Sequence, residues 1–322
     1  SVAVYDVPNY AQRCTMKLEP ERFGRAQFSS DGELLLFSTS RYEAGAALHS
    51  DEARLHSARD GRALGTLAPG AVITWAELSP NGERAVTTTK TGSVTVWRVP
   101  ACERDGDALE LGVSVVCARF TRDSSALVLG TEAKDGRGVL VWDLATRTTR
   151  TLDFEARGRV LSIDVSPRDR IVATSSDMQV TTWERDGRKL ASFRAWMPPL
   201  ETRWTRDGER LFTPSRTSFV QVWWGENRPD VYALRGHTSA VTSACFNFDG
   251  ARALTVSKDG TARLWHTPRG ANERGEHEPG TQLAVFGDAN AAVTTALFSK
   301  DGARVVTLAS DGTVATWSAN DG

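Results

Sequence analysis

Short runs of alternating hydrophobic and polar residues fill this chain, and turn residues separate them. The stretch 236–265 shows the pattern most completely: one run reaches Phe246, and an Asn-Phe-Asp-Gly turn follows it. A second run reaches Thr255, and a third run ends at Trp265 after a Lys-Asp-Gly turn. Two turns between three β-rich runs predict two successive hairpins, and therefore a three-stranded antiparallel meander.

The same pattern occurs seven times in the chain, at intervals of 50, 42, 45, 39, 42 and 52 residues. The Phe246 position is held in turn by Phe28, Leu78, Phe120, Val165, Trp204, Phe246 and Phe298. Two residues earlier a small or β-branched residue stands in every unit: Ala26, Ala76, Ala118, Ile163, Thr202, Ala244 and Ala296. The Trp265 position is held by His56 in the first unit and then by Trp97, Trp142, Trp183, Trp223, Trp265 and Trp317.

The stretch 236–265 resembles the WD40 repeat, a four-stranded propeller blade that closes on Trp-Asp or a variant. Here His266 follows Trp265. The chain is similar to WD40 propellers of the degenerate, bacterial type, and the resemblance covers nearly all of it. It implies an all-β fold: a single domain over 1–322 that forms a seven-bladed β-propeller of four-stranded antiparallel blades. Small side chains would be needed where the innermost strands crowd around the axis.

The two ends of the chain are expected to share one blade. Seven repeats occupy 23–322, and the last stops five residues after Trp317, which is too few for a fourth strand. Residues 11–22 contain a strand-like alternation, so we expect them to close the last blade and remove a sheet edge. Residues 1–10 are expected to be an N-terminal extension or the end of an upstream blade. An insertion over 38–52 is expected to stretch the second turn of the first unit.

The resemblance also implies a structural hydrogen-bonding tetrad of His237, Thr255, Asp259 and Trp265. His, Thr and Asp could in principle form a catalytic triad. The structural role is preferred, because the imidazole would bridge the carboxylate to the hydroxyl, and the hydroxyl would reach the indole N–H. Each buried polar group would then be satisfied.

Composition argues against several classes of function. A net charge of −1 and a pI near 6.5 give no electrostatic footprint for nucleic acid or for an anionic membrane. No apolar run is long enough to span a membrane. The five histidines and four cysteines lack metal-ligand spacing, and no phosphate-binding or nucleophile-elbow motif occurs. We therefore expect no metal, no cofactor, no catalysis, a reduced cytoplasmic setting and a monomeric propeller.

Tryptophans that fall off the repeat register are the strongest functional signal. Trp75 lies on an innermost strand, and Trp196 with Met197 lies in an apolar loop that enters the fifth unit. Large apolar residues where the register predicts exposure are typical of binding hot spots. The predicted binding surface comprises Trp75, Trp196, Met197, Tyr42, Arg159, Arg216, Lys90 and Lys258. The alternative is that Trp196 anchors its loop and that each cation is simply solvated.

These patterns predict a non-catalytic scaffold or sensor that binds a protein or peptide, within a larger multidomain signalling protein. The alternative left open is an enzyme or small-molecule-binding propeller with a site in the axial channel. Binding of nucleic acid is disfavoured by the neutral charge. The step from propeller to partner rests on analogy, because a fold does not fix a function.

Overall fold

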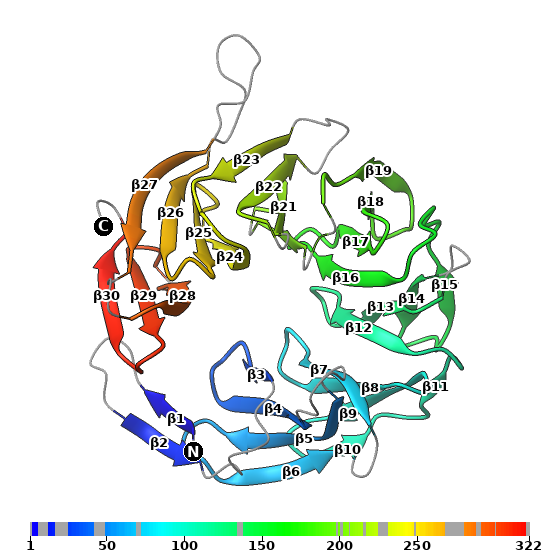
Figure 1. Cartoon of the computed structure of the whole chain (residues 1–322). Coiled ribbons are helices and arrows are strands. Elements are labelled where there is room, and N and C mark those ends of the chain that lie inside the picture. Colours follow the sequence, from blue (N-terminus) through cyan, green and yellow to red (C-terminus); the bar gives the residue numbers. More distant parts are fainter. Residues whose placement is uncertain are drawn as a thin grey trace. The chain divides into compact units, whose positions relative to one another are not determined.

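In the computed structural model, all regular structure in the described residues is β-strand. The described residues are 2–5, 12–16, 25–41, 49–68, 72–133, 138–197, 199, 202–205, 207–214, 217–224, 231–247, 249–267, 280–287, 291–299 and 301–319. They divide into two compact units, Ser1–Leu152 and Asp153–Gly322. Figure 1 labels the strands of both units in chain order.

The first unit holds a hairpin and three repeats. The hairpin is β1 (Val2–Tyr5) and β2 (Gln12–Met16). The first repeat is β3 (Arg25–Phe28), β4 (Leu34–Arg41), β5 (His49–Ser57) and β6 (Ala63–Leu67). The second is β7 (Ile73–Leu78), β8 (Arg84–Thr89), β9 (Ser93–Arg98), β10 (Glu103–Arg104) and β11 (Leu109–Glu110). The third is β12 (Val115–Phe120), β13 (Ala126–Thr131), β14 (Val139–Asp143) and β15 (Thr149–Thr151).

The second unit holds four repeats. The fourth repeat is β16 (Val160–Val165), β17 (Ile171–Ser175), β18 (Gln179–Trp183) and β19 (Lys189–Arg194). The fifth is β20 (Arg203–Trp204), β21 (Arg210–Pro214), β22 (Phe219–Trp224) and β23 (Val231–Arg235). The sixth is β24 (Val241–Phe246), β25 (Arg252–Ser257), β26 (Ala262–His266) and β27 (Thr281–Phe286). The seventh is β28 (Val293–Phe298), β29 (Arg304–Ala309) and β30 (Val314–Ser318).

The seven predicted repeats are confirmed as antiparallel meanders. The third to sixth repeats each form a separate four-stranded sheet. The first two share one nine-stranded sheet, because Ser50 of β5 pairs with Ile73 of β7. Every predicted Phe position ends the first strand of its repeat, and every predicted Trp position lies on the third. The period of the sequence pattern therefore gave both the number of repeats and their internal register.

Asp-Gly turns set the register between the first two strands of a repeat. In the fifth repeat Gly208 has a φ of 71°, a left-handed conformation that glycine adopts without steric cost. The carboxylate of Asp207 accepts the Glu209 N–H at 2.9 Å and so closes the turn. Gly250 in the sixth repeat has a φ of 68° and plays the same part.

The first repeat and the N-terminal hairpin depart from the pairing expected of the N-terminal part. The insertion over 38–52 does not simply stretch a turn: β4 and β5 are lengthened, and Arg41 still pairs with His49. Strand β2 pairs with β1, and Val4, Cys14 and Met16 of this hairpin form a core cluster with residues of β4 and with Ala58, which directly follows β5. The closure of the last repeat by residues 11–22 stays a prediction.

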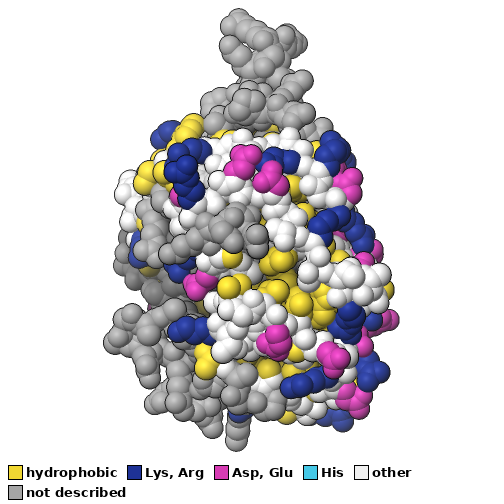
Figure 2. All heavy atoms as spheres, turned by 90° about the vertical axis from the view of Figure 1, so that its right-hand side faces the viewer, with side chains coloured by type: hydrophobic (Ala, Val, Ile, Leu, Met, Phe, Trp, Pro, Cys, Tyr) yellow, Lys and Arg dark blue, Asp and Glu magenta, His cyan; other side chains and the backbone are white. Residues whose placement is uncertain are grey.

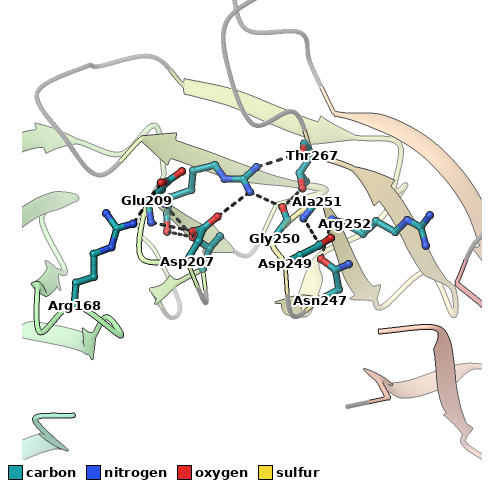
Figure 3. A network of polar contacts seen from close by, with 11 residues as sticks. Arg168, Asp207, Glu209, Asn247, Asp249, Gly250, Ala251, Arg252 and Thr267 are labelled. Carbon is teal, nitrogen blue, oxygen red and sulfur yellow. Dashed lines mark hydrogen bonds and ion pairs between the residues drawn. The ribbon is translucent and has the colours of Figure 1, made fainter. Parts of the chain in front are cut away.

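A fully buried arginine joins the fifth and sixth sheets (Figure 3). Arg210 opens β21, and its guanidinium donates to the carbonyls of Gly250 at 2.5 Å and Thr267 at 3.3 Å. The same group lies 3.5 Å from the Asp207 carboxylate. Arg252 occupies the equivalent position of the sixth repeat and donates to the carbonyl of Ala319 in the seventh. The carbonyls of Thr267 and Ala319 directly follow the third strands of their repeats, whereas the Gly250 carbonyl lies in the first turn of the sixth repeat and also accepts the Thr267 hydroxyl at 2.6 Å.

Candidate binding surface

The structure brings the four tetrad residues together in the sixth repeat. The indole N–H of Trp265 donates to Thr255 Oγ1 at 2.8 Å, and Thr255 Oγ1 lies 2.7 Å from His237 Nε2. His237 Nδ1 lies 2.8 Å from Asp259 Oδ2. Because a carboxylate only accepts, Nδ1 carries the proton, and the threonine hydroxyl donates to Nε2. The chain of bonds fastens the loop that enters β24 to the third strand of the same sheet.

Both ionisable groups of the tetrad have displaced pKa values. Burial lowers the pKa of His237, and the neighbouring Asp259 offsets this only in part. Burial opposes ionisation of Asp259, but hydrogen bonds from Thr261, Thr238 and His237 outweigh it and hold the pKa of Asp259 well below its usual range. The folded protein therefore contains neutral His237 and ionised Asp259.

Acid is expected to weaken the protein through this tetrad. The pKa of His237 is lower in the folded state than its ordinary value of 6.5, so protons bind preferentially to the unfolded chain below that pH. The stability contribution is thus present above pH 6.5 and is lost as the pH falls. Urea unfolding at pH 7, 6 and 5 measures this effect. Between pH 7 and pH 5 the free energy of unfolding should fall less in His237→Gln than in the wild type. Equal pH slopes in the two proteins would contradict this assignment.

Trp196 is anchored through its backbone while its ring stays exposed. The Trp196 N–H donates to Oε1 of the buried Gln221 at 3.1 Å. Trp196 as a whole is 47% exposed, and Met197 is 41% exposed. The indole ring lies 6.0 Å from the ring of Phe219, and the Arg235 guanidinium lies 4.6 Å from Phe219 and 5.8 Å from Trp196. We call Trp196, Met197, Phe219 and Arg235 the Trp196 surface.

Trp75, the other off-register tryptophan, is half-buried against a neighbouring sheet. The guanidinium of Arg119 on β12 lies 4.7 Å from the Trp75 ring on β7. The same guanidinium donates to the Glu77 carboxylate, and both charged side chains are buried. Trp75 also packs against the hydrophobic core between the second and third repeats. This environment gives Trp75 a packing role between adjacent sheets of the first unit.

Lys90 and Lys258 directly follow the second strands of their repeats, whereas Arg159 directly precedes the first strand of the fourth repeat. Lys90, Arg159 and Lys258 are exposed. Backbone bonds place each one where the loop entering a repeat meets the turn after its second strand: Lys90 N donates to Val72 O, Lys258 N to Ala240 O, and Ser176 N to Arg159 O. Tyr42 and Arg216 lie outside the described residues. The role of all these residues in binding stays a prediction.

Phe219 and Arg235 complete the Trp196 surface, and neither stood out in the sequence. Phe219 opens β22 and Arg235 ends β23, next to each other across the sheet, since the two residues are register partners. If the third and fourth strands of this repeat had been paired as a hairpin from the sequence, Phe219 and Arg235 would have been predicted to lie side by side.

A second set of functional candidates also escaped the sequence pattern. The residue before the Phe position is Glu77, Arg119, Asp164 and Arg203 in the second to fifth repeats. Glu77 pairs with Arg119 in the first unit, and Arg203 Nη1 lies 3.5 Å from Asp164 Oδ1 in the second. The charge at this position alternates between negative and positive from one repeat to the next. This alternation was visible in the sequence, and it predicts ion pairs between the first strands of neighbouring repeats.

Surface charge is mixed on the face seen in Figure 2, where Lys and Arg side chains are interspersed with Asp and Glu. Among the described residues, no group of three or more His, Cys, Asp or Glu is placed to hold a metal ion. The described part of the chain also contains no helix that could cross a membrane.

Comparison with known proteins finds a family model and relatives that match parts of this chain. The family model "WD domain, G-beta repeat" matches residues 147–184 and 229–266. Eukaryotic translation initiation factor 3 subunit I of Xenopus tropicalis is 32% identical over 102 residues, which are 32% of this chain and 28% of that protein. Periodic tryptophan protein 2 of Saccharomyces cerevisiae is 26% identical over 196 residues, 56% of this chain and 20% of that protein. The matches thus span under a third of either relative.

A solved structure covers almost the whole chain. The C-terminal WD40 domain of Sif2 superposes with a TM-score of 0.74 over 97% of this chain and 87% of that one, at 14% sequence identity. At this identity the likeness shows the fold alone. The all-β architecture predicted from the sequence, with the seven repeats of a WD40 propeller, is confirmed.

Proposed function

Because the chain is a WD40-repeat protein, we propose that it is a non-catalytic module that binds a protein or peptide partner through the Trp196 surface. The observation that carries the proposal is the half-exposed indole of Trp196 beside an exposed Met197. Exposed tryptophan of this kind is costly to leave in water and is enriched among the residues that dominate binding energy.

The backbone of the Trp196 surface is already fixed before a partner arrives. The Trp196 N–H is bound to buried Gln221, and its ring rests on Phe219, which begins a strand. A surface that is ordered in advance loses less conformational entropy when it binds. In this proposal the backbone of Trp196 anchors its loop and the ring contacts the partner. Both interpretations of Trp196 from the sequence then apply to the same residue.

Charge complementarity indicates the chemistry of the partner. Arg235 is exposed, with its guanidinium over Phe219 and near the Trp196 ring. Arg194, exposed at the end of β19, adds a second cation shortly before Trp196 in the chain. A partner segment that carries an apolar side chain next to Asp or Glu fits this combination, because the apolar group covers the rings and the carboxylate meets the guanidinium groups.

The catalytic alternative is disfavoured by the geometry of the only Thr-His-Asp constellation among the described residues. Thr255 is fully buried, and its hydroxyl already accepts from Trp265 and donates to His237. A nucleophile must reach its substrate, and this hydroxyl is enclosed. The relatives support a scaffold role, since one is by name a subunit of a larger factor. We further propose that this module is part of a larger multidomain signalling protein in the cytoplasm.

Capture of partners by matched variants tests the proposal. Trp196→Ala removes an exposed ring and should leave the thermal midpoint nearly unchanged. Wild type, Trp196→Ala and the control Val285→Ala, which changes an equally exposed apolar residue outside the predicted surface, are immobilised and exposed to lysate of the source cell. We expect a partner that the wild type and Val285→Ala retain and that Trp196→Ala loses. Retention of every partner by Trp196→Ala would contradict the assignment of this surface.

A further inference from the structure

Met178 holds a backbone conformation that glycine holds in other repeats. It lies in the turn between β17 and β18, and its φ is 70°. The same turn in the second, sixth and seventh repeats has Gly92, Gly260 and Gly312 at this position, with φ of 94°, 85° and 88°. In all four turns this residue donates its N–H to the carbonyl three residues earlier. A left-handed conformation costs free energy in any residue with a Cβ atom, so methionine stands here against the preference of the backbone.

The turn that carries Met178 is bonded to the loop that carries Trp196. The Ala195 N–H donates to the Met178 carbonyl at 2.8 Å. The Arg194 guanidinium donates to the Asp177 carbonyl at 3.0 Å. Ala195 directly precedes Trp196, and the fourth and fifth repeats are neighbours in the second unit (Figure 1). Met178 therefore lies at the border of the Trp196 surface, on the adjacent sheet.

The core uses only part of the Met178 side chain. Met178 packs at the margin of a cluster that residues of the fourth and fifth repeats form, among them Val180 and Trp204, and it stays partly exposed. Glycine here would give up a marginal contact and would remove the backbone strain. Core packing alone thus gives little reason for methionine, whereas its flexible, polarizable side chain suits a surface that binds apolar groups.

Exposed cations flank these apolar side chains. Arg157, Arg194 and Arg235 are all exposed. The nearby carboxylate of Asp177 is engaged within the protein: Oδ2 accepts the Arg157 backbone N–H at 3.0 Å, and Oδ1 accepts the Ser175 hydroxyl. Positive charge beside apolar side chains complements a segment that carries Asp or Glu next to apolar residues.

Resting on the binding role proposed for the Trp196 surface, we propose that this surface extends to Met178 and takes an acidic segment of a protein partner. One apolar side chain of the segment covers the rings of Trp196 and Phe219, a second contacts Met178, and the flanking carboxylates meet the arginines. An anionic membrane also offers acidic and apolar groups, but a net charge of −1 gives the chain no overall attraction to one. A protein segment is therefore the occupant that the charges favour.

Fluorescence anisotropy with labelled acidic peptides tests the two apolar contacts. The probes are short peptides of Asp and Glu with two leucines separated by one, two, three or four residues. Each is compared with its two single-leucine versions and with a version in which lysine replaces every acid. We expect saturable binding of at least one two-leucine acidic peptide, and at least about five-fold weaker binding of its single-leucine versions, because each leucine adds apolar burial. No saturable binding in the acidic set, or equal binding of the lysine versions, overturns the proposal.

Met178→Gly and Met178→Asn test the location, because both new residues tolerate a left-handed backbone. Each variant should keep its thermal midpoint within about 3 °C of the wild type. Each should bind the best two-leucine peptide at least about five-fold more weakly, yet bind one of the single-leucine versions as the wild type does, which identifies the leucine that contacts Met178. The control Ser124→Gly relaxes another left-handed residue, with a φ of 60°, in the first unit and should leave every affinity unchanged. Unchanged peptide affinity in both Met178 variants, or a larger fall of the midpoint in both, overturns the proposal.

Trp196→Ala separates this inference from the function proposed above. Loss of the best peptide in Trp196→Ala, with full affinity in both Met178 variants, would leave the proposed function standing and would overturn the extension to Met178. Loss in the Met178 variants, with full affinity in Trp196→Ala, would contradict the proposed function instead. Co-sedimentation with phosphatidylglycerol vesicles that these variants abolish would assign the surface to a membrane and overturn the protein partner.

Discussion

Replacing Trp265 with alanine should lower the free energy of unfolding by about 3–5 kcal/mol, the usual cost of removing a large buried aromatic side chain. Trp265 is 1% exposed and packs in a core with Phe212, Val222 and Leu234 of the preceding sheet. The substitution leaves a cavity between two sheets and deprives the Thr255 hydroxyl of its donor. Chemical unfolding monitored by far-ultraviolet circular dichroism measures the change.

The matched control is Trp317→Ala in the seventh repeat. Trp317 makes the same bond, donating to Thr307 Oγ1 at 2.8 Å, but its side chain is only partly buried. Its removal should cost clearly less than that of Trp265. Equal losses for the two variants would show that burial between sheets is not what makes Trp265 important.

The second large effect is expected at Arg210. Arg210→Ala removes a guanidinium that is completely buried, leaves the Thr267 carbonyl without this donor, and takes a cation from Asp207. The stacking of the guanidinium, 5.5 Å from Trp224 and 5.6 Å from Phe246, is lost as well. Removing one partner of a buried polar network should cost about 3 kcal/mol. The thermal midpoint and the urea midpoint should both fall.

Arg304→Ala is the control for Arg210, because Arg304 opens the second strand of the seventh repeat at the same position but is exposed. Its loss should change stability by less than about 0.5 kcal/mol. If Arg210→Ala were as mild as Arg304→Ala, the bridge drawn between the fifth and sixth sheets in Figure 3 would contribute nothing measurable.

The repeat architecture was predictable because it depends on local signals. Phe246 marks the end of a first strand, Asp249-Gly250 marks the turn after it, and Trp265 marks the third strand. Each of these signals depends only on residues that are close in the sequence. The tetrad positions followed from the same register. The lengthened hairpin of the first repeat was missed because the residues near Arg41 and His49 show no clear alternation of hydrophobic and polar side chains. They pair because the hydrogen bonding between β4 and β5 continues into this segment.

The contacts between repeats were less predictable, because they join residues far apart in the sequence. Gln221 fixes the backbone of Trp196 across 25 residues, and Arg210 reaches Thr267 across 57. The sequence identified Trp196 as out of register, yet its pairing with Phe219 and Arg235 depends on how a loop folds back on its sheet. The Arg119 guanidinium of the following repeat lies 4.7 Å from the Trp75 ring, a contact that the sequence pattern did not indicate, and a binding role for Trp75 stays a prediction.

The most direct test of the central claim locates the bound partner by amide hydrogen exchange. The partner captured by the wild-type protein is added, and exchange is compared with that of the free protein. Slower exchange is expected at 195–197, at the start of β22 and at the end of β23, where the Trp196 surface lies. Protection elsewhere on the chain, with these three segments unchanged, would contradict the account.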